Sequence, residues 1–216
     1  MRNLFIIIIS SFILVSCVEV PCRNGLERRP MYGKTQKCKQ QLLEDEQFIK
    51  DSENQYGSKE AASEAMLRFA WKHYVDGNLD ASMERFNQAW LLDSLNNETY
   101  MGFANILSDQ GKFEESVEFV QRSLSLHPES SDNVRFLGLT YENLYFQTQK
   151  EDYLNLSIEQ LKKSISINPD NSLSYAMLAE VYNLANKNDS ARKYMEITDT
   201  LNPGLIKPEL RDKITE

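Results

Sequence analysis

The chain has 216 residues, of which 41% are hydrophobic and 26% are charged, a composition typical of a globular protein with a substantial core. Its formal net charge of −8 argues against a nucleic-acid-binding protein, which would present a basic face. The sequence contains no HExxH, GxSxG, P-loop or dinucleotide-binding motif. Neither an enzyme nor a metal or cofactor site is therefore expected.

Residues 1–16 have the features of a signal peptide for export. Arg2 precedes the apolar stretch Leu4–Val15, which is shorter than the ~20 apolar residues that a membrane-spanning helix needs. The stretch ends in the letters LVSC at residues 14–17, which resemble the lipobox of bacterial lipoproteins. This resemblance implies cleavage before Cys17, lipidation of its thiol and acylation of the new amino terminus, and several acyl chains together make a lasting anchor. The alternative is an ordinary secretory signal that is cut nearby, with Cys17 incidental.

The residue after the cysteine carries a sorting signal in that lipoprotein family. An aspartate there commonly means retention in the inner membrane of Gram-negative bacteria. Val18 occupies this position, so the resemblance implies a lipid-anchored protein of the outer membrane in the bacterial cell envelope. The periplasmic and the surface-exposed side are both open.

Residues 17–57 are expected to form a tether that ends in a helix. Cys22 and Cys38 are a possible disulfide, because a cysteine pair in an exported chain is typical of one, and closing this loop would stabilise the fold by ~3 kcal/mol. The alternative is two separate thiols, whereas zinc is not expected because no histidine or further cysteine lies nearby. The residues between positions 21 and 39 are mainly basic, and we interpret them as a solvated linker rather than a lipid contact: Arg23, Arg28, Arg29, Lys34, Lys37 and Lys39.

From Lys39 to about Gln55 the pattern becomes helical. This helix is expected to cap the open end of the first repeat, because terminal repeats of a stacked array need a cap. Ser58 is expected to be the N-cap of the next helix, with Glu60 in the first turn. The apolar residues of the capping helix are Leu42, Leu43, Phe48 and Ile49.

From residue 58 to 216 the chain is predicted to be one domain built from a repeated pair of helices. The pairs align on closing positions that are 34, 41 and 34 residues apart: Ser94, Pro128, Pro169 and Pro203. The repeats cover approximately residues 63–96, 97–130, 131–171 and 172–205, and a C-terminal cap helix begins at Pro208. One pair cannot bury its own apolar stripe, so successive pairs are expected to stack around a continuous core.

The interior of each repeat follows the same order of small and large residues. Small residues in the first helices let two helix backbones approach closely: Ala70, Ala104, Gly138 and Ala179. Gly77 and Gly111 are expected to end the first helix of their repeats, with Asn186 as a substitute in the last one. The third repeat has an insertion around Tyr145–Glu151, which is expected to lengthen the tip of that helix pair on one edge of the stack.

Over roughly Ser63 to Leu205, this spacing and these positions resemble the tetratricopeptide repeat family. The resemblance implies an all-α fold: a right-handed α-solenoid of about four helix hairpins, with an N-terminal cap helix and a short C-terminal helix. It also implies that ligands lie along the concave face formed by the first helices. The corresponding positions are Leu67, Trp71, Tyr74, Met101, Asn105, Ser108, Arg135, Leu139, Glu142, Ala176, Glu180 and Asn183.

This face is expected to be apolar and aromatic at its N-terminal end and polar beyond it. Trp71 is the residue expected to contribute most to binding, because an indole offers a large contact area at low entropic cost. Asn105 and Arg135 lie on neighbouring first helices and could hold a peptide backbone or a carboxylate.

Two considerations limit this interpretation. Trp71, Tyr74 and Met101 could instead pack only beneath the N-terminal cap helix. The carboxylate clamp of chaperone-binding members of the family needs lysines at the positions of Leu67 and Glu98, so a chaperone tail is not the expected ligand.

Together these features favour a lipid-anchored adaptor that binds a protein or peptide partner in an envelope assembly, and not nucleic acid. Pilus-secretin pilotins and adaptors for cell-wall hydrolases are cases that it resembles. A self-associating structural lipoprotein, and hence a homo-oligomer, is one alternative. An accessory subunit of an enzyme is another. His73 occupies a repeat core position, so it is expected to be a packed residue rather than a general base.

Overall fold

The computed structural model describes residues 20–215, so the predicted signal peptide and Cys17 lie outside the described residues. Within this range all regular structure is helical. No helix of the described part is both long and apolar enough to cross a membrane. The α-helices are α1 (Lys39–Tyr56), α2 (Lys59–Val75), α3 (Leu79–Leu92), α4 (Asn97–Asp109), α5 (Phe113–Leu126), α6 (Ser131–Thr148), α7 (Glu151–Ile167), α8 (Ser172–Leu184), α9 (Asn188–Leu201) and α10 (Pro208–Thr215).

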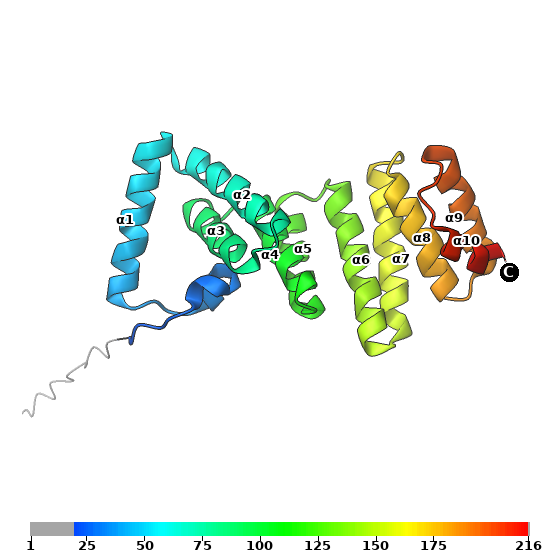
Figure 1. The fold of residues 1–216 in the computed structure, drawn as a ribbon, viewed down its shortest axis with the longest axis horizontal. Coiled ribbons are helices and arrows are strands. Elements are labelled where there is room, and N and C mark those ends of the chain that lie inside the picture. The colour runs from blue at the N-terminus through cyan, green and yellow to red at the C-terminus, as the bar shows by residue number, and fades with distance from the viewer. Residues whose placement is uncertain (1–19, 216) are drawn as a thin grey trace, which may run out of the picture.

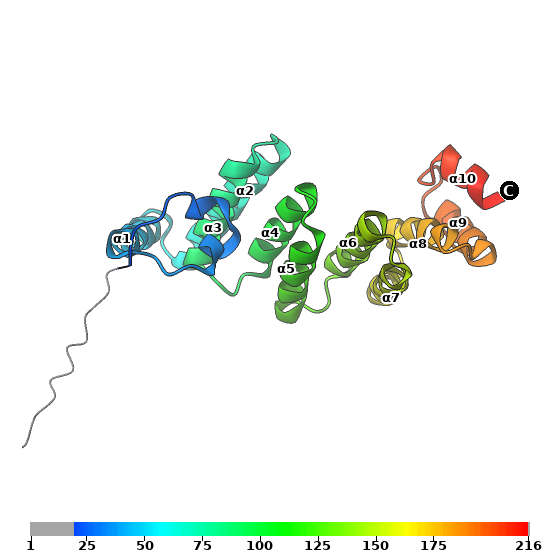
Figure 2. The same cartoon turned by 90° about the horizontal axis from the view of Figure 1, so that it is seen from below.

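The helices form a row of four antiparallel pairs, α2/α3, α4/α5, α6/α7 and α8/α9, with α1 at one end and α10 at the other (Figure 1). A view turned by 90° shows the pairs following one another along the long axis (Figure 2). Each second helix packs on the first helix of the next pair. The buried apolar residues form two clusters, one that runs from α2 to α6 and one that runs from α7 to α10. The predicted all-α solenoid of four helix hairpins with a cap at each end is confirmed. We call the side formed by α2, α4, α6 and α8 the first-helix face.

Left-handed residues end the first helix of every pair. Gly77 (φ 75°), Gly111 (φ 72°) and Asn186 (φ 54°) do so as predicted from the sequence. In the third pair this residue is Gln149 (φ 58°), which the sequence pattern did not reveal because a glutamine is rarely found in this conformation. Ser58 is confirmed as the N-cap of α2, where its hydroxyl accepts the amide N–H of Ala61.

The insertion in the third repeat is helical. Only Gln149 and Lys150 lie between α6 and α7, which have 18 and 17 residues, whereas α4 and α5 have 13 and 14. The extra residues therefore extend both helices beyond the neighbouring pairs, as Figure 1 shows at the lower end of α6 and α7.

The segment before α1 is folded, so the interpretation of it as a solvated linker is wrong. It forms two short 3₁₀ turns, η1 (Leu26–Arg28) and η2 (Pro30–Lys34), that pack on α3. Leu26 is buried, and the buried Asn87 side chain of α3 accepts the Tyr32 N–H and donates to two carbonyl oxygens of the segment. These three hydrogen bonds join parts of the chain more than 50 residues apart, and no local pattern predicts them.

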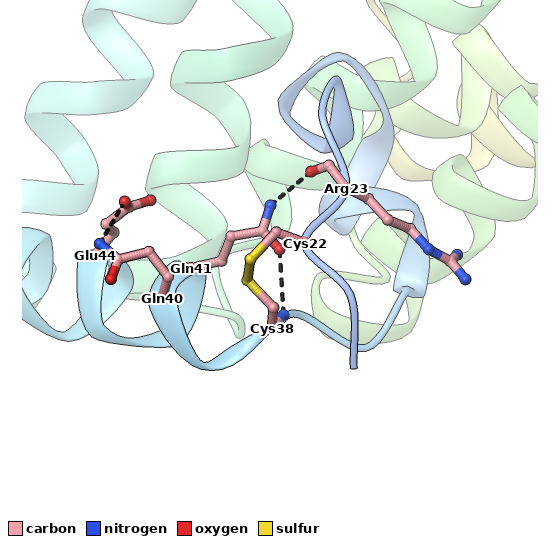
Figure 3. Close-up of a disulfide and its surroundings, with 6 residues drawn as sticks. All are labelled: Cys22, Arg23, Cys38, Gln40, Gln41 and Glu44. Carbon is pink, nitrogen blue, oxygen red and sulfur yellow. Dashed lines mark hydrogen bonds between the residues drawn. A yellow bond between two sulfur atoms is a disulfide. The ribbon is translucent and has the colours of Figure 1, made fainter. Parts of the chain in front are cut away.

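A disulfide links Cys22 to Cys38, with a Cα–Cα distance of 4.9 Å, and closes the loop that contains both 3₁₀ turns (Figure 3). Gln41 fastens the base of this loop. Its side-chain amide donates to the Arg23 carbonyl oxygen at 2.6 Å and accepts the Cys38 N–H at 3.2 Å. The loop and the start of α1 therefore form one covalently closed unit.

Helix α1 covers the end of the stack with its second half. Phe48, Ile49 and Tyr56 pack against the core, whereas Leu42 and Leu43 are half exposed. The first half is instead held by the preceding loop, where Lys37 forms an ion pair with Asp45 at 2.6 Å. The expected cap is present, but it covers the first repeat less completely than its apolar pattern predicted.

A serine at the crossing of each of the first three pairs gives a matched test of buried hydrogen bonds. Ser116 Oγ donates to the Ala104 carbonyl oxygen at 2.9 Å, whereas Ser157 Oγ is buried without a hydrogen-bond partner. We expect Ser116→Ala to lower the free energy of unfolding by about 1 kcal/mol. Ser157→Ala should leave it unchanged or raise it by up to about 1 kcal/mol, because the cost of an unsatisfied hydroxyl is removed. Urea unfolding of both variants measures this, and equal losses would contradict the assignment.

Candidate functional site

The structure places the twelve predicted groove residues on the first-helix face, but it does not expose all of them. Leu67, Met101 and Glu142 are buried by neighbouring helices, so they offer little surface to a ligand. Glu180 is exposed, and the other eight residues are partly exposed: Trp71, Tyr74, Asn105, Ser108, Arg135, Leu139, Ala176 and Asn183. Two hollows gather most of these side chains, and among the exposed or partly exposed ones Tyr74, Ser108 and Leu139 line neither.

The first hollow has a volume of about 340 Å³ and lies between α4 and α6, with Trp71 of α2 at its edge. We call it the polar hollow. It brings together four predicted residues: Trp71, Met101, Asn105 and Arg135. The other residues that line it are mostly polar: Asn97, Glu98, Ser130, Asp132, Asn133 and Phe136.

Trp71 is anchored within this face. Its indole N–H donates to Glu98 Oε1 at 2.7 Å, and its ring meets the edge of the Phe86 ring at a centroid distance of 5.1 Å. Trp71 and Tyr74 thus pack on the core of the first two repeats, and Trp71 also lines the polar hollow. Trp71 therefore contacts α3 and α4 through one part of its indole ring and lines the polar hollow with another.

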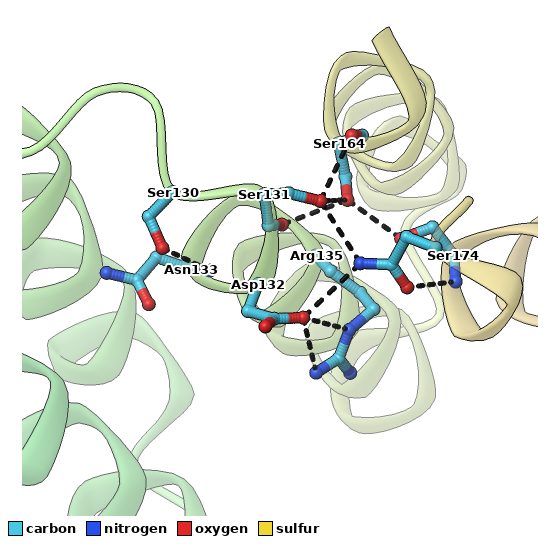
Figure 4. Close-up of polar contacts among 8 residues, drawn as sticks. Ser130, Ser131, Asp132, Asn133, Arg135, Ser164 and Ser174 are labelled. Carbon is cyan, nitrogen blue, oxygen red and sulfur yellow. Dashed lines mark hydrogen bonds and ion pairs between the residues drawn. The ribbon is translucent and has the colours of Figure 1, made fainter. Parts of the chain in front are cut away.

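Arg135 is positioned through Asp132, which accepts its guanidinium N–H groups at 3.4 and 3.5 Å (Figure 4). Asn171, at the start of α8, donates to Asp132 Oδ1 at 3.3 Å. A buried network of hydroxyl groups from α6, α7 and α8 lies behind this contact, made by Ser131, Ser164 and Ser174. Because buried and satisfied networks are rigid, the network fixes the third repeat against the fourth and sets the place of Arg135.

The second hollow has a volume of about 420 Å³ and lies between α8 and the C-terminal segment that carries α10. We call it the apolar pocket. Phe146 and Leu173 flank it with exposed fractions of 52% and 45%, which are high for large apolar side chains. It includes three predicted residues, Ala176, Glu180 and Asn183, and ten others: Phe146, Leu173, Met177, Leu184, Leu205, Ile206, Lys207, Glu209, Leu210 and Lys213.

The far wall of the apolar pocket is held by contacts of α10. Ile214 is fully buried, and Arg211 forms a two-pronged ion pair with Asp199 of α9 at 2.7 and 2.8 Å. That contact lowers the pKa of the Asp199 carboxyl, chiefly through the hydrogen bonds from Arg211. The expected order of the face is therefore reversed: the polar hollow lies towards the N-terminus, and the apolar pocket lies at the C-terminal end.

Glu142 lies on α6 between the two hollows. It is 4% exposed, and burial together with the negative charge of Glu180 on α8 raises the pKa of its carboxyl to about 8. At the other end of the face, burial raises the pKa of the Tyr74 hydroxyl, and Asp109 of α4 adds to the shift. Acidic groups thus accompany the first-helix face along much of its length.

The comparisons with known proteins agree with this architecture. Residues 98–130 and 161–193 each match a sequence model described as a tetratricopeptide repeat. No curated protein sequence matches the chain.

Several solved structures are similar in fold. A thermophilic tetratricopeptide repeat protein of Thermus thermophilus has a TM-score of 0.60 and 21% identity, over 70% of this chain and 79% of its own. YrrB, described as having an unusual peptide-binding site, has a TM-score of 0.57 and 14% identity, over 77% of this chain and 90% of its own. PilF of Pseudomonas aeruginosa has a TM-score of 0.57 and 18% identity, over 82% of this chain and 90% of its own. The chain therefore contains tetratricopeptide repeats and has the solenoid fold of these proteins, a fold that serves as a scaffold for protein–protein interaction.

Proposed function

We propose that this protein is a lipid-anchored scaffold of the bacterial cell envelope that binds an extended segment of a partner protein along its first-helix face. The observation that carries the binding part is the placing of two hollows, of about 340 and 420 Å³, on this one face. The described site of YrrB supports a peptide as the ligand class, since that protein has a similar fold. The anchor rests on the lipobox-like sequence that ends at Cys17.

The distance between the hollows fits a short extended segment. Arg135 and Phe146 mark the two hollows on α6 and are eleven residues apart, which corresponds to about 16 Å along a helix. About five residues of an extended chain cover this distance. A partner segment that reaches both hollows would therefore contact this protein over at least five of its residues.

The binding part is tested with one substitution in each hollow. Arg135→Ala and Phe146→Ala should each weaken capture of the partner from detergent-solubilised envelopes by about tenfold or more, as expected for central contacts of an interface. Leu95→Ala is the matched control, because Leu95 is an exposed apolar residue that lines neither hollow. Capture that is equal for all three variants would contradict binding on this face.

The anchor is tested separately. Cells grown with labelled palmitate should label the wild-type protein but not Cys17→Ala, and the mature wild-type chain should begin at residue 17. A mature chain that begins elsewhere and carries no lipid would contradict the anchor, and it would leave the test of the binding face intact.

A further inference from the structure

We propose that the side of the stack formed by the second helices α3 and α5 binds a second partner segment, one that carries aspartate or glutamate next to a large apolar residue. The site lies where the disulfide-closed loop, residues 22–38, packs on α3 beside α5 (Figures 1 and 2). The inference goes beyond the proposed function, which concerns the first-helix face only. A scaffold with both sites would hold two segments at once.

The first step is a pair of adjoining hollows at this place. One has a volume of about 450 Å³ and the other of about 440 Å³, and each is lined by residues of the loop, α3, α4 and α5. Lys34, Glu118 and Phe119 line both hollows, so the two are neighbours. Hollows of this size accept large side chains. We call the pair the loop groove.

The second step is the floor of the 440 Å³ hollow. The rings of Tyr100 and Phe119 are buried and stack with their centroids 6.5 Å apart. Lys34 Nζ lies 5.8 Å from the centre of the Phe119 ring, and the Arg122 guanidinium lies 5.6 Å from the centre of the Tyr100 ring. A cation over the face of an aromatic ring is attracted to it. These contacts therefore hold two exposed cations, one from the loop and one from α5, above an apolar surface.

The third step is the charge of the loop groove. Two of its lining residues are acidic, Glu115 and Glu118, and five are basic. Among the described residues, one of these five forms an ion pair, which joins Arg28 to Asp80 at 3.4 Å. An excess of positive charge thus lines this groove in a chain whose net charge is −8, so an anionic segment is the complementary ligand. The basic residues are Arg28, Arg29, Lys34, Lys112 and Arg122.

The fourth step is the backbone of the loop at the groove. Four consecutive residues of η2 are left-handed: Met31 (φ 52°), Tyr32 (φ 53°), Gly33 (φ 70°) and Lys34 (φ 52°). Residues other than glycine disfavour this conformation, and it persists only where the surrounding structure enforces it, as the hydrogen bond from the Tyr32 N–H to Asn87 does here. Strain of this kind is typical of binding sites. In this loop it places Met31 and Lys34 in the lining of the same hollow.

These features define the class of ligand. The aromatic floor and Met31 suit a large apolar side chain, whereas Lys34 and Arg122 suit a carboxylate beside it. The acidic and the apolar residue of the ligand should therefore be neighbours or be separated by one residue. An anionic membrane surface carries charge of the same sign, but a concave groove fits protruding side chains better than a layer of head groups.

The probe is a phage-displayed library of random twelve-residue peptides. It is selected on the described chain, residues 20–215, with its disulfide formed and with Arg135→Ala and Phe146→Ala, which disable the first-helix face. Enriched peptides should carry aspartate or glutamate beside leucine, phenylalanine, methionine, tyrosine or tryptophan.

Paired variants test the two cations. The best peptide should bind Lys34→Asn/Arg122→Gln at least tenfold more weakly by fluorescence anisotropy. Asparagine is chosen at position 34 because it tolerates the left-handed backbone, so the loop keeps its conformation. The matched control is Lys39→Gln/Lys163→Gln, which removes the same charge from two exposed lysines that line neither hollow, and it should change the Kd less than twofold.

A second readout separates a direct charge contact from a change in packing. Replacing the acidic residue of the peptide by its amide should weaken binding to the protein with an intact loop groove about tenfold. The same replacement should change binding to Lys34→Asn/Arg122→Gln less than twofold, because the charges that it would lose are already gone. Equal losses for the two proteins would place the acidic residue elsewhere and overturn the inference.

The outcomes keep the two proposals apart. Enriched peptides without acidic residues, or peptides that bind Lys34→Asn/Arg122→Gln normally, would overturn this inference and leave the proposed function standing. So would a library from which no peptide is enriched, even if the chain then binds phosphatidylglycerol vesicles through Lys34 and Arg122. The proposed function is judged separately, by capture of the partner with Arg135→Ala and Phe146→Ala.

Discussion

Replacing Glu142 by glutamine should stabilise the protein, and the gain should grow with pH. The folded-state pKa of Glu142 is raised from 4.5 to about 8, chiefly by burial and then by the charge of Glu180. The folded state therefore binds a proton that the unfolded state has already released between these two pH values. Wild-type stability falls by about 1.4 kcal/mol for each pH unit in this window, relative to a variant that cannot ionise.

The expected difference is near zero at about pH 4 and reaches about 5 kcal/mol, as an upper bound, at about pH 9. Urea unfolding of the wild type and Glu142→Gln at several pH values measures it. Glu180→Gln is the control: this residue is exposed, so its loss should stabilise only slightly, through relief of the repulsion at Glu142. A difference between Glu142→Gln and the wild type that does not change with pH would contradict the buried, unpaired state of this carboxyl.

The sign of this effect bears on function. A residue that lowers the stability of the unliganded protein, and that a simple amide could replace, is more typical of a binding site than of a packing position.

The repeat pattern of the sequence predicted those structural features that depend on residue spacing within one repeat. Helix pairs, their small crossing residues and the left-handed turn residues Gly77 and Gly111 follow from spacings within one repeat. Each of these features is decided within about 34 residues, so a periodic pattern carries the information. Gln149 is the exception, because the longer third repeat moves the turn onto a residue without the usual preference for it.

The features that were missed depend on contacts between distant parts of the chain. The loop before α1 is folded because Asn87 meets three of its backbone groups across more than 50 residues. The apolar pocket exists because α10 packs beside α8, which turns Phe146 and Leu173 from ordinary surface residues into its rim. Periodicity placed the predicted groove residues on one face of the stack, but only packing decides which of them stay exposed.

Gly102 gives the second large prediction, because a repeat position that is normally large is occupied here by a glycine. In the aligned first helices this position holds Arg68, Gly102, Phe136 and Met177. A methyl group on Gly102 would overlap the ring of Phe86, which is fully buried and lies against Trp71 and Phe103. We expect Gly102→Ala to lower the free energy of unfolding by about 3 kcal/mol, despite the better helix propensity of alanine.

Two further variants make this prediction specific. Gly138→Ala should cost less, about 1 kcal/mol, because its added methyl group meets Leu161 Cγ at 2.8 Å and Cδ2 at 3.0 Å, a smaller overlap than the one with the Phe86 ring. The smaller side chain in Phe86→Leu should make room for the methyl group, so Gly102→Ala should cost clearly less in that background than in the wild type. Equal costs in the two backgrounds would show that the Phe86 ring is not the cause.

The same substitution should also affect binding. Since Trp71 contacts the Phe86 ring, Gly102→Ala should weaken peptide binding at the polar hollow. Gly138→Ala should not, because Gly138 lies beside Leu161 of α7.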